Sequence, residues 1–253
     1  MRQALTEPSQ EQAVTGKAPA FVHLRVHTEY SLVDSVVRVK PLMAALSNDQ
    51  MPAAALTDQS NLFAMVKFTR AALDAGIKPI IGVDVWVRPD DEQALPYRMV
   101  LLCKNREGYL NLSQLISRSY LEGQHGGVPM VQSAWVEEFA EGLIALSGGR
   151  EGEIGRALLS GQKDQARQRL EHWKSVFPNS FYLELIRTGR ENEEVYIVEA
   201  VELALQSGTP VVATNDVRFL KPEDFDAHEV RVCITAGRTL DDPRRSKNYS
   251  DQQ

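Results

Sequence analysis

Short runs of apolar residues alternate with amphipathic runs along most of the chain. The short runs are continuous rather than strictly alternating, which is typical of strands that are covered on both faces. They predict seven strands, over Phe21–Val26, Ala53–Leu56, Ile77–Val87, Tyr97–Cys103, Leu143–Leu146, Phe181–Leu185 and Pro210–Thr214.

Amphipathic segments with helical spacing lie between or after most of these strands. They predict helices over Val37–Leu46, Leu62–Ala75, Leu110–Leu121, Ile154–Leu159, Ala166–Val176, Val195–Leu205 and Phe225–Ile234. Gly76, Gly161 and Gly208 stand where three of these helices should end. The alternation favours an α/β fold with a parallel sheet, either closed into a barrel or open and doubly wound. Seven strand units suit a single barrel domain.

The two ends of the chain differ in character from the part between them. Residues 1–18 are polar, and we interpret them as a disordered leader. Residues 19–240 form the predicted domain. Residues 241–253 are again polar, and we interpret them as the start of a connection to a further domain rather than as a terminus packed on the core.

The composition is that of a globular protein with a surplus of acidic residues. Of 253 residues, 43% are hydrophobic and 25% are charged, with a formal net charge of −6 at pH 7. Such a chain is a poor non-specific binder of nucleic acid, because it lacks the surplus of cations that releases phosphate counterions. Cys103 and Cys233 form neither a CxxC pair nor a disulfide framework, which suits the reducing cytoplasm. The sequence shows no transmembrane segment and no signal peptide.

Polar residues follow several predicted strands, at the position where parallel α/β folds place their active sites. Imidazole and carboxylate groups from separate strand ends can converge on metal ions. The candidates are His27, Asp34, Asp58, Asp84 and Asp216. Each has a simpler interpretation, since Asp34 and Asp58 could cap the next helices and a lone His27 is more often a satisfied histidine than a ligand. Arginines also fall in this predicted pocket, at Arg25, Arg98, Arg150 and Arg218.

Longer motifs make the sequence more specific. The chain contains, in this order, FVHLRVHTEYSLVDS, AALTDQSNLFAMVKF, GIKPIIGVDVWV, LLCKNREGYLNLSQLIS, GLIALSGG, FYLELIRTGR and PVVATNDVRFL. Together they closely resemble the N-terminal polymerase and histidinol phosphatase (PHP) domain of bacterial DNA polymerase III alpha subunits, in its proteobacterial form. The resemblance covers about residues 21–253. It implies a distorted (βα)7 barrel, similar to a TIM barrel, in which His, Asp and Glu at the strand ends bind up to three metal ions that hydrolyse phosphate esters.

The resemblance assigns nine ligand positions, and four of them keep a plausible ligand. His27 matches the second histidine of the family's His-x-His motif. Asp34 keeps a carboxylate at the next position, and Asp84 stands in place of a glutamate that bridges metals. Asp216 keeps the aspartate of the final Asp-x-His motif.

The other five positions lose their ligand in this sequence. They are Arg25, Gln59, Gly149, Thr188 and Arg218. A guanidinium stays charged and has no acceptor, so it cannot ligate a metal. We expect Arg25 and Arg218 to pair with at least one surviving carboxylate and to occupy the metal volume, and we expect folding to be independent of metal. No cofactor is firmly expected, although the pattern leaves room for a single Mg²⁺ or for a phosphate held by the arginines.

The resemblance leaves three functions open. The first is a non-catalytic scaffold that braces the remaining domains of the alpha subunit and docks the proofreading exonuclease subunit. DNA-directed DNA polymerase activity, and with it contact with DNA, would then belong to domains after Gln253. The second is a residual metal-dependent phosphoesterase, acting as a 3′–5′ exonuclease or a pyrophosphatase, which the ligand count disfavours. The third, a free-standing sugar-phosphate enzyme, rests on fold analogy alone. We favour the scaffold, in the cytoplasm and away from any membrane.

Overall fold

The computed structural model describes residues 21–91, 94–245 and 247–252, so the predicted leader over 1–18 lies outside the described residues. The main sheet has the strand order β1–β2–β3–β7–β8–β9. These strands are β1 (Ala53–Leu56), β2 (Lys78–Arg88), β3 (Tyr97–Cys103), β7 (Leu143–Leu146), β8 (Phe181–Ile186) and β9 (Val211–Thr214). A short β6 (Val131–Gln132) pairs with β2, and β4 (Gln124–His125) pairs with β5 (Val128–Pro129).

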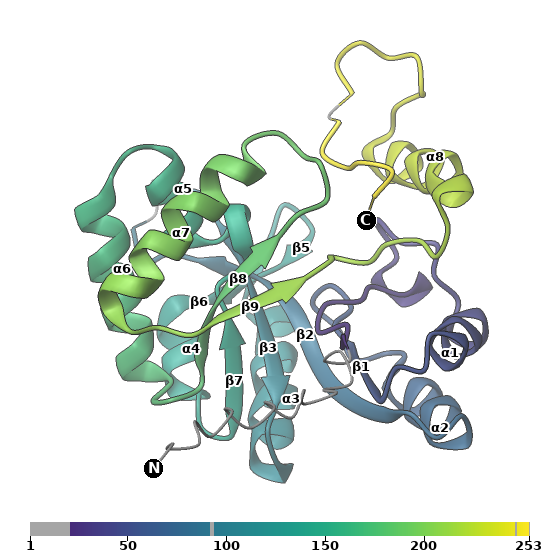
Figure 1. Ribbon diagram of the computed structural model, residues 1–253, viewed down its shortest axis with the longest axis horizontal. Helices are drawn as coiled ribbons and strands as arrows, with labels where there is room; N and C mark the ends of the chain where they lie inside the picture. The colour runs from purple at the N-terminus through teal and green to yellow at the C-terminus, as the bar shows by residue number, and fades with distance from the viewer. Residues whose placement is uncertain (1–20, 92–93, 246, 253) are drawn as a thin grey trace, which may run out of the picture.

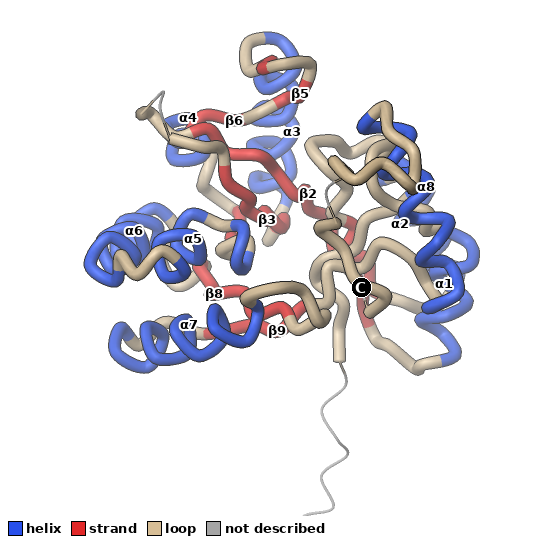
Figure 2. Tube along the Cα trace, turned by 90° about the horizontal axis from the view of Figure 1, so that it is seen from above, coloured by secondary structure: helices blue, strands red, loops and turns tan. Residues whose placement is uncertain are grey.

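The first predicted strand closes this sheet into a ring, although it makes only isolated bridges. On one side, the Ala55 amide of β1 donates to the His23 carbonyl at 2.8 Å. On the other side, the His27 amide donates to the Val217 carbonyl at 2.9 Å, and the Val217 amide donates to the Arg25 carbonyl at 3.1 Å. Figure 2 shows the strands gathered at the centre with helices around them. The predicted distorted barrel is therefore confirmed.

The predicted parallel arrangement is wrong for β3, which runs antiparallel to both β2 and β7. Only a short loop joins Arg88, at the end of β2, to Tyr97, at the start of β3. A parallel return needs a crossover of a dozen or more residues, so these two strands form a hairpin instead. The reversal brings the first residues of β3, including Arg98, to the barrel end at which the parallel strands finish.

Helices surround the ring on most sides. They are α1 (Val39–Asn48), α2 (Met65–Asp74), α3 (Arg106–Leu121), α4 (Ser133–Glu138), α5 (Glu153–Leu159), α6 (Lys163–Val176), α7 (Glu193–Ser207) and α8 (Phe225–Ala236), with 3-10 turns η1 (Glu29–Ser31), η2 (Gly149–Glu151) and η3 (Pro222–Asp224). Figure 1 shows α5, α6 and α7 on one side of the sheet and α1 and α2 on the other. No helix in the described part of the chain has the length and apolar character needed to cross a bilayer.

Capping residues set the ends of helices that the spacing of apolar residues does not predict accurately. The Asn105 side chain accepts from the Gly108 amide at 2.9 Å, so α3 begins at Arg106 rather than at Leu110. Gly208 has a φ of +64° and ends α7, as expected for a glycine in the left-handed region. The short helix α4 and the hairpin of β4 and β5 are additions that the sequence analysis did not predict.

Successive side chains along each strand face alternately the surrounding helices and the inside of the ring. Val83 and Val85 of β2, and Leu183 of β8, pack in a large apolar core that includes Trp173 of α6. Val100 of β3 belongs to a separate small cluster. That small cluster consists of Ala55, Val100, Leu102 and Leu146, which alternate with residues packed under the helices. It therefore lies inside the ring, and the buried polar residues Asp84, Arg98 and Glu184 also face inward, nearer the ends of the parallel strands.

Candidate functional site

A cluster of buried ionic side chains occupies the inside of the barrel at the strand ends. Arg25 and His27 are two residues apart on the first segment, so both point inward. Asp84 of β2 and Glu184 of β8 stand between core residues and take the same direction. Asp216 follows β9, has a φ of +51° and is fully buried.

Arg25 lies at the middle of the cluster and is fully buried. Its Nε and Nη2 atoms lie 2.9 Å and 2.7 Å from Oδ2 of Asp84. Its Nη1 atom contacts Oε2 of Glu184 at 3.1 Å, and its Nε atom lies 3.2 Å from Oδ1 of Asp216. One guanidinium thus holds carboxylates from three separate strands or strand ends.

Two further arginines contact the same carboxylates from the flanks. Arg98 donates from Nε to Oδ1 of Asp84 at 2.9 Å, and its guanidinium stacks 4.7 Å from the centre of the Trp86 ring. Arg218 donates from Nη2 to Oδ1 of Asp216 at 2.9 Å and also forms an ion pair with Asp34. The predicted proximity of Arg25 and Arg218 to the surviving carboxylates is therefore confirmed.

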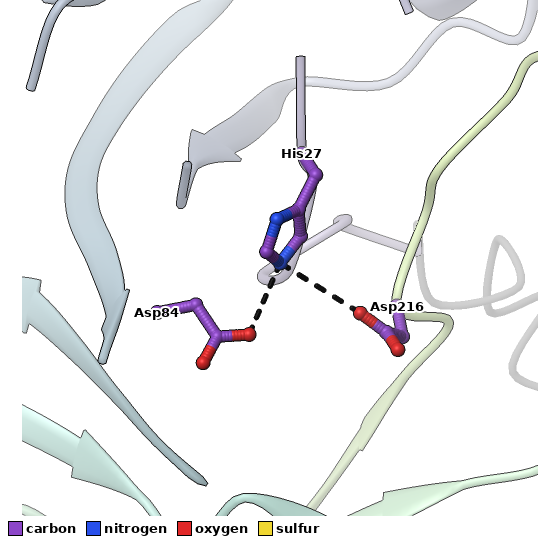
Figure 3. A group of neighbouring side chains, drawn as sticks. All are labelled: His27, Asp84 and Asp216. Atoms are coloured by element: carbon purple, nitrogen blue, oxygen red, sulfur yellow. Dashed lines mark hydrogen bonds and ion pairs between the residues drawn. The ribbon is translucent and has the colours of Figure 1, made fainter. Parts of the chain in front are cut away.

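His27 lies between the two main carboxylates, as Figure 3 shows. Its Nε2 atom is 3.0 Å from Oδ2 of Asp84 and 3.8 Å from Oδ1 of Asp216. Its Nδ1 atom is 3.0 Å from the Ser31 hydroxyl and 4.0 Å from Oδ1 of Asp34. One ligand atom from each of His27, Asp84 and Asp216 lies within 4.8 Å of the others, a spacing that could hold a metal ion. The fold therefore brings three of the four predicted ligand positions together, and their role as metal ligands stays a prediction.

The carboxylate oxygens of this group already have cationic partners. Both oxygens of Asp84 contact Arg98, and Oδ2 also contacts Arg25. Oδ1 of Asp216 contacts Arg25 and Arg218, while its Oδ2 atom lies 3.4 Å from Nη1 of Arg190. A metal ion at this point would have to displace these guanidinium groups, and all four arginines are buried.

The environment of the cluster lowers the pKa of some of its carboxyl groups and raises that of others. Burial alone would raise the pKa of Asp84 and of Asp216, but the neighbouring guanidiniums hold both well below the usual range of an aspartate. The pKa of Asp34 is lowered in the same way, against burial, by Arg218. Burial raises the pKa of Glu184, and repulsion from Asp84 and Asp216 adds to this effect. Arg25, its main cationic neighbour, lowers the pKa but does not offset the increase.

We expect the lowered pKa values to make the fold acid-sensitive. A carboxyl group with a lowered folded pKa stabilises the protein above its unfolded pKa, about 4, and loses that contribution as the pH falls. Glu184, with a raised pKa, contributes with the opposite sign. We test this by urea unfolding of the natural chain and of Asp84→Asn between pH 7 and pH 3. The free energy of unfolding of Asp84→Asn should be well below that of the natural chain at pH 7, and this difference should become smaller towards pH 3. A gap that stays constant over this range would contradict the assignment for Asp84.

Asp34 and the end of the chain meet at the edge of the cluster. The Tyr249 hydroxyl donates to Oδ2 of Asp34 at 2.8 Å, and the Tyr249 ring lies 5.5 Å from the Arg218 guanidinium. The His228 ring packs against Tyr249 at 4.6 Å between centroids. Asp34 therefore does not cap a helix. The tail over 241–253, expected not to pack on the core, instead covers this edge with Tyr249, although its role as a connection stays a prediction.

Asp58 also differs from its simple interpretation as a helix cap. It accepts hydrogen bonds from the Thr28 amide at 2.5 Å, from the Thr28 hydroxyl at 2.8 Å and from the Ser31 hydroxyl at 2.8 Å. It therefore fixes the turn that carries His27 rather than the start of α2. Burial raises the pKa of Asp58 despite these donors.

Three of the positions predicted to have lost their ligand have other local roles in the structure. The side-chain oxygen Oε1 of Gln59 accepts a hydrogen bond from Nη1 of Arg98 at 3.2 Å. Gly149 has a φ of +60°, and a Cβ atom there would lie 2.9 Å from Cδ1 of Ile186. The Thr188 hydroxyl donates to Glu193 at 2.9 Å and so turns towards α7. Any ligating side chain at these positions would need a different local packing.

Several members of the cluster were missed from the sequence. Glu184 is a lone carboxylate inside the apolar run FYLELI, and that isolation is the signal that could have found it. Arg190 and Glu193 form a buried pair at 2.8 Å at the start of α7, and Tyr249 stands in a polar tail. Arg150, expected in the pocket, instead donates to the Glu191 carbonyl at 3.1 Å. Burial raises the pKa of the Cys103 thiol to about 11, which disfavours the thiolate at neutral pH.

Comparison with known proteins now defines the class. The family model of the PHP domain matches residues 23–188, and the chain belongs to this family. Two curated relatives are DNA polymerase III subunits alpha. The subunit from Pseudomonas aeruginosa is 56% identical over 234 residues, which cover 92% of this chain and 20% of that subunit. The subunit from Escherichia coli K12 is 49% identical over 238 residues, again with 20% of its length covered. The chain thus spans about a fifth of these relatives.

Solved structures agree on the fold at low sequence identity. A protein from Bifidobacterium adolescentis, described as a metal-dependent phosphoesterase, aligns with a TM-score of 0.55 at 12% identity, covering 78% of this chain and 87% of its own. An amidohydrolase from Chromobacterium violaceum aligns with a TM-score of 0.51 at 11% identity, covering 83% of this chain and 96% of its own. At this identity the likeness concerns the fold alone, and it agrees with the distorted barrel.

Proposed function

We propose that this chain acts as the PHP domain of a cytoplasmic DNA polymerase III alpha subunit, in which an ion-pair core replaces the metal centre. The single observation that carries the proposal is the position of three arginines. The guanidiniums of Arg25, Arg98 and Arg218 contact the carboxylate oxygens that a metal would need. Because an arginine stays charged and accepts no metal, these residues do not fit a centre with two or three metals.

The ion-pair core suits a scaffold because it joins distant parts of the chain. Arg25 connects the first segment to β2, β8 and the end of β9, and Arg98 adds β3. Buried ion pairs add little net stability when compared with apolar residues of the same size, but breaking one is costly. Such a network therefore favours one arrangement of the strand ends. A fixed arrangement is what neighbouring polymerase domains would require of a domain that braces them.

A hydrolysis assay tests the alternative of a residual phosphoesterase. The purified chain is incubated with a chromogenic phosphoester and with a 3′-labelled DNA primer, in the presence of Mn²⁺, Mg²⁺ or Zn²⁺. We expect no turnover above that of Asp216→Asn, since the Oδ1 atom of Asp216 already contacts two guanidiniums. Metal-dependent turnover that this substitution abolishes would contradict the scaffold proposal and support a 3′–5′ exonuclease or a pyrophosphatase.

We further propose that the domain docks the proofreading exonuclease subunit of the polymerase. The support is that the chain belongs to the PHP family and is similar to DNA polymerase III alpha subunits. As a scaffold in such a subunit, the domain would serve to bind a partner. Size-exclusion chromatography of the chain mixed with the exonuclease subunit of the same organism tests this directly. Co-elution as a stoichiometric complex is expected. Separate elution at micromolar concentrations of both proteins would contradict the docking role.

A further inference from the structure

An open groove lies at the start of β2, several residues before Asp84 and so towards the other end of the barrel. Lys78–Ile81 pair with β1, whereas pairing with β3 begins only at Gly82. Since β3 ends at Cys103, the sheet opens between the two strands at this point. The opening leaves a groove of about 850 Å³, flanked by residues of α2 and of the start of α3. Its size falls in the range of binding pockets.

The floor of the groove is apolar, and part of it packs against the cluster inside the ring. Ile80 and Ile144 are half-buried and pack against the small cluster inside the ring. Ile81 and Cys103 complete the floor. Apolar side chains of α2 continue this surface outward, because Val66 is 55% exposed. The Phe63 ring, just before α2, is also exposed, at 60%.

The rim of the groove is basic. It carries Arg70, Lys78 and Lys104, and none of the residues that line the groove is acidic. Within the described residues, Arg70 and Lys78 form no ion pair, while the Lys104 ammonium donates to the Ser180 hydroxyl at 3.4 Å. This concentration of unpaired cations stands out in a chain with a net charge of −6. It gives the groove a charge opposite to that of the protein as a whole.

We propose that the groove binds an acidic segment of another polypeptide through apolar side chains placed between its carboxylates. The apolar floor would bury the anchoring side chains, and the cationic rim would pair with the flanking acids and select against basic segments. Single-stranded nucleic acid fits less well, because it needs several aromatic faces for its bases and Tyr109 is the only aromatic residue in the lining. Every residue that this binding mode requires belongs to the groove, so it does not depend on whether the metal centre is lost.

Fluorescence anisotropy on the full chain tests this proposal. The probe is a short fluorescein-labelled peptide of alternating leucine and glutamate pairs, and its matched control replaces each glutamate by lysine. The acidic peptide should bind, the basic peptide should not, and added salt should weaken binding because the rim is solvent-exposed. The double variant Arg70→Glu/Lys78→Glu should weaken binding by at least about tenfold, the loss expected from reversing charges at the interface. Val66→Ser should weaken binding without changing its salt dependence.

The control variant is Arg38→Glu/Lys40→Glu, which reverses two exposed cations at the start of α1, and neither residue lines the groove. It should bind the acidic peptide as tightly as the natural chain does. Equal loss of binding in both double variants would show that only net charge matters and would overturn the proposal. Tighter binding of an oligothymidine of similar length than of the acidic peptide would also overturn it, in favour of a nucleic-acid surface.

Discussion

Replacing Arg25 by methionine is expected to lower the free energy of unfolding by about 3–5 kcal/mol, the cost of breaking a buried ion pair by removing one partner. Arg25 is fully buried and contacts carboxylates of Asp84, Glu184 and Asp216. Methionine restores much of the volume but none of the charge. The three carboxylates would then face one another without their central cation. Urea unfolding followed by circular dichroism at pH 7 measures the loss.

Two companion variants keep this prediction testable even if the methionine variant does not fold. Arg25→Lys keeps the charge but offers a single ammonium in place of a planar fork, so we expect an intermediate loss. Arg38→Met removes an exposed arginine before α1 and should change stability by no more than about 0.5 kcal/mol. A loss at Arg25→Lys that matches Arg38→Met would show that the geometry of the guanidinium does not matter.

The double variant Arg25→His/Arg218→His is expected to gain metal binding. It restores the histidines that the PHP family pattern has at these positions, and it removes two guanidiniums from the oxygens of Asp84 and Asp216. Without metal it should be less stable than the natural chain, for the same reason as Arg25→Met. With Mn²⁺ or Zn²⁺ at a hundred times the dissociation constant, binding to the folded state alone should return about 2.7 kcal/mol of stability.

Thermal unfolding with and without chelator measures this gain. The melting temperature of the double variant should rise with metal and fall again with EDTA. Adding Asp216→Asn to the double variant is the matched control, and it should remove most of the response. A double variant that remains insensitive to metal would contradict the explanation that Arg25 and Arg218 are what blocks the centre. Binding would then be prevented by other features, such as Arg98, which still contacts both oxygens of Asp84, or the lost position at Gly149.

The sequence predicted the strands better than their directions. Apolar runs placed β1, β3 and β7 at their observed bounds, because strands covered on both faces are largely apolar. Direction is not encoded in such a run, and β3 was wrongly taken as parallel. The short stretch between Arg88 and Tyr97 carried the missing information, since it has no room for a crossover.

The candidate site was predictable in part. Motif resemblance located His27, Asp84 and Asp216, which the fold then brings within 4.8 Å. Glu184 escaped because a single carboxylate in an apolar strand reads as a surface position until the barrel closes around it. Tyr249 escaped because its partner Asp34 is more than two hundred residues away in sequence. Contacts of this kind depend on tertiary structure alone.

The most direct test of the central claim is equilibrium dialysis of the purified natural chain against Mn²⁺ and Zn²⁺, followed by measurement of bound metal. The chain is first stripped with EDTA, and Asp84→Asn is dialysed in parallel. If arginines have taken the place of the metals, the natural chain and the variant will show no stoichiometric uptake. One or more equivalents bound by the natural chain and lost in Asp84→Asn would show that the carboxylates still serve a metal, and would contradict the account.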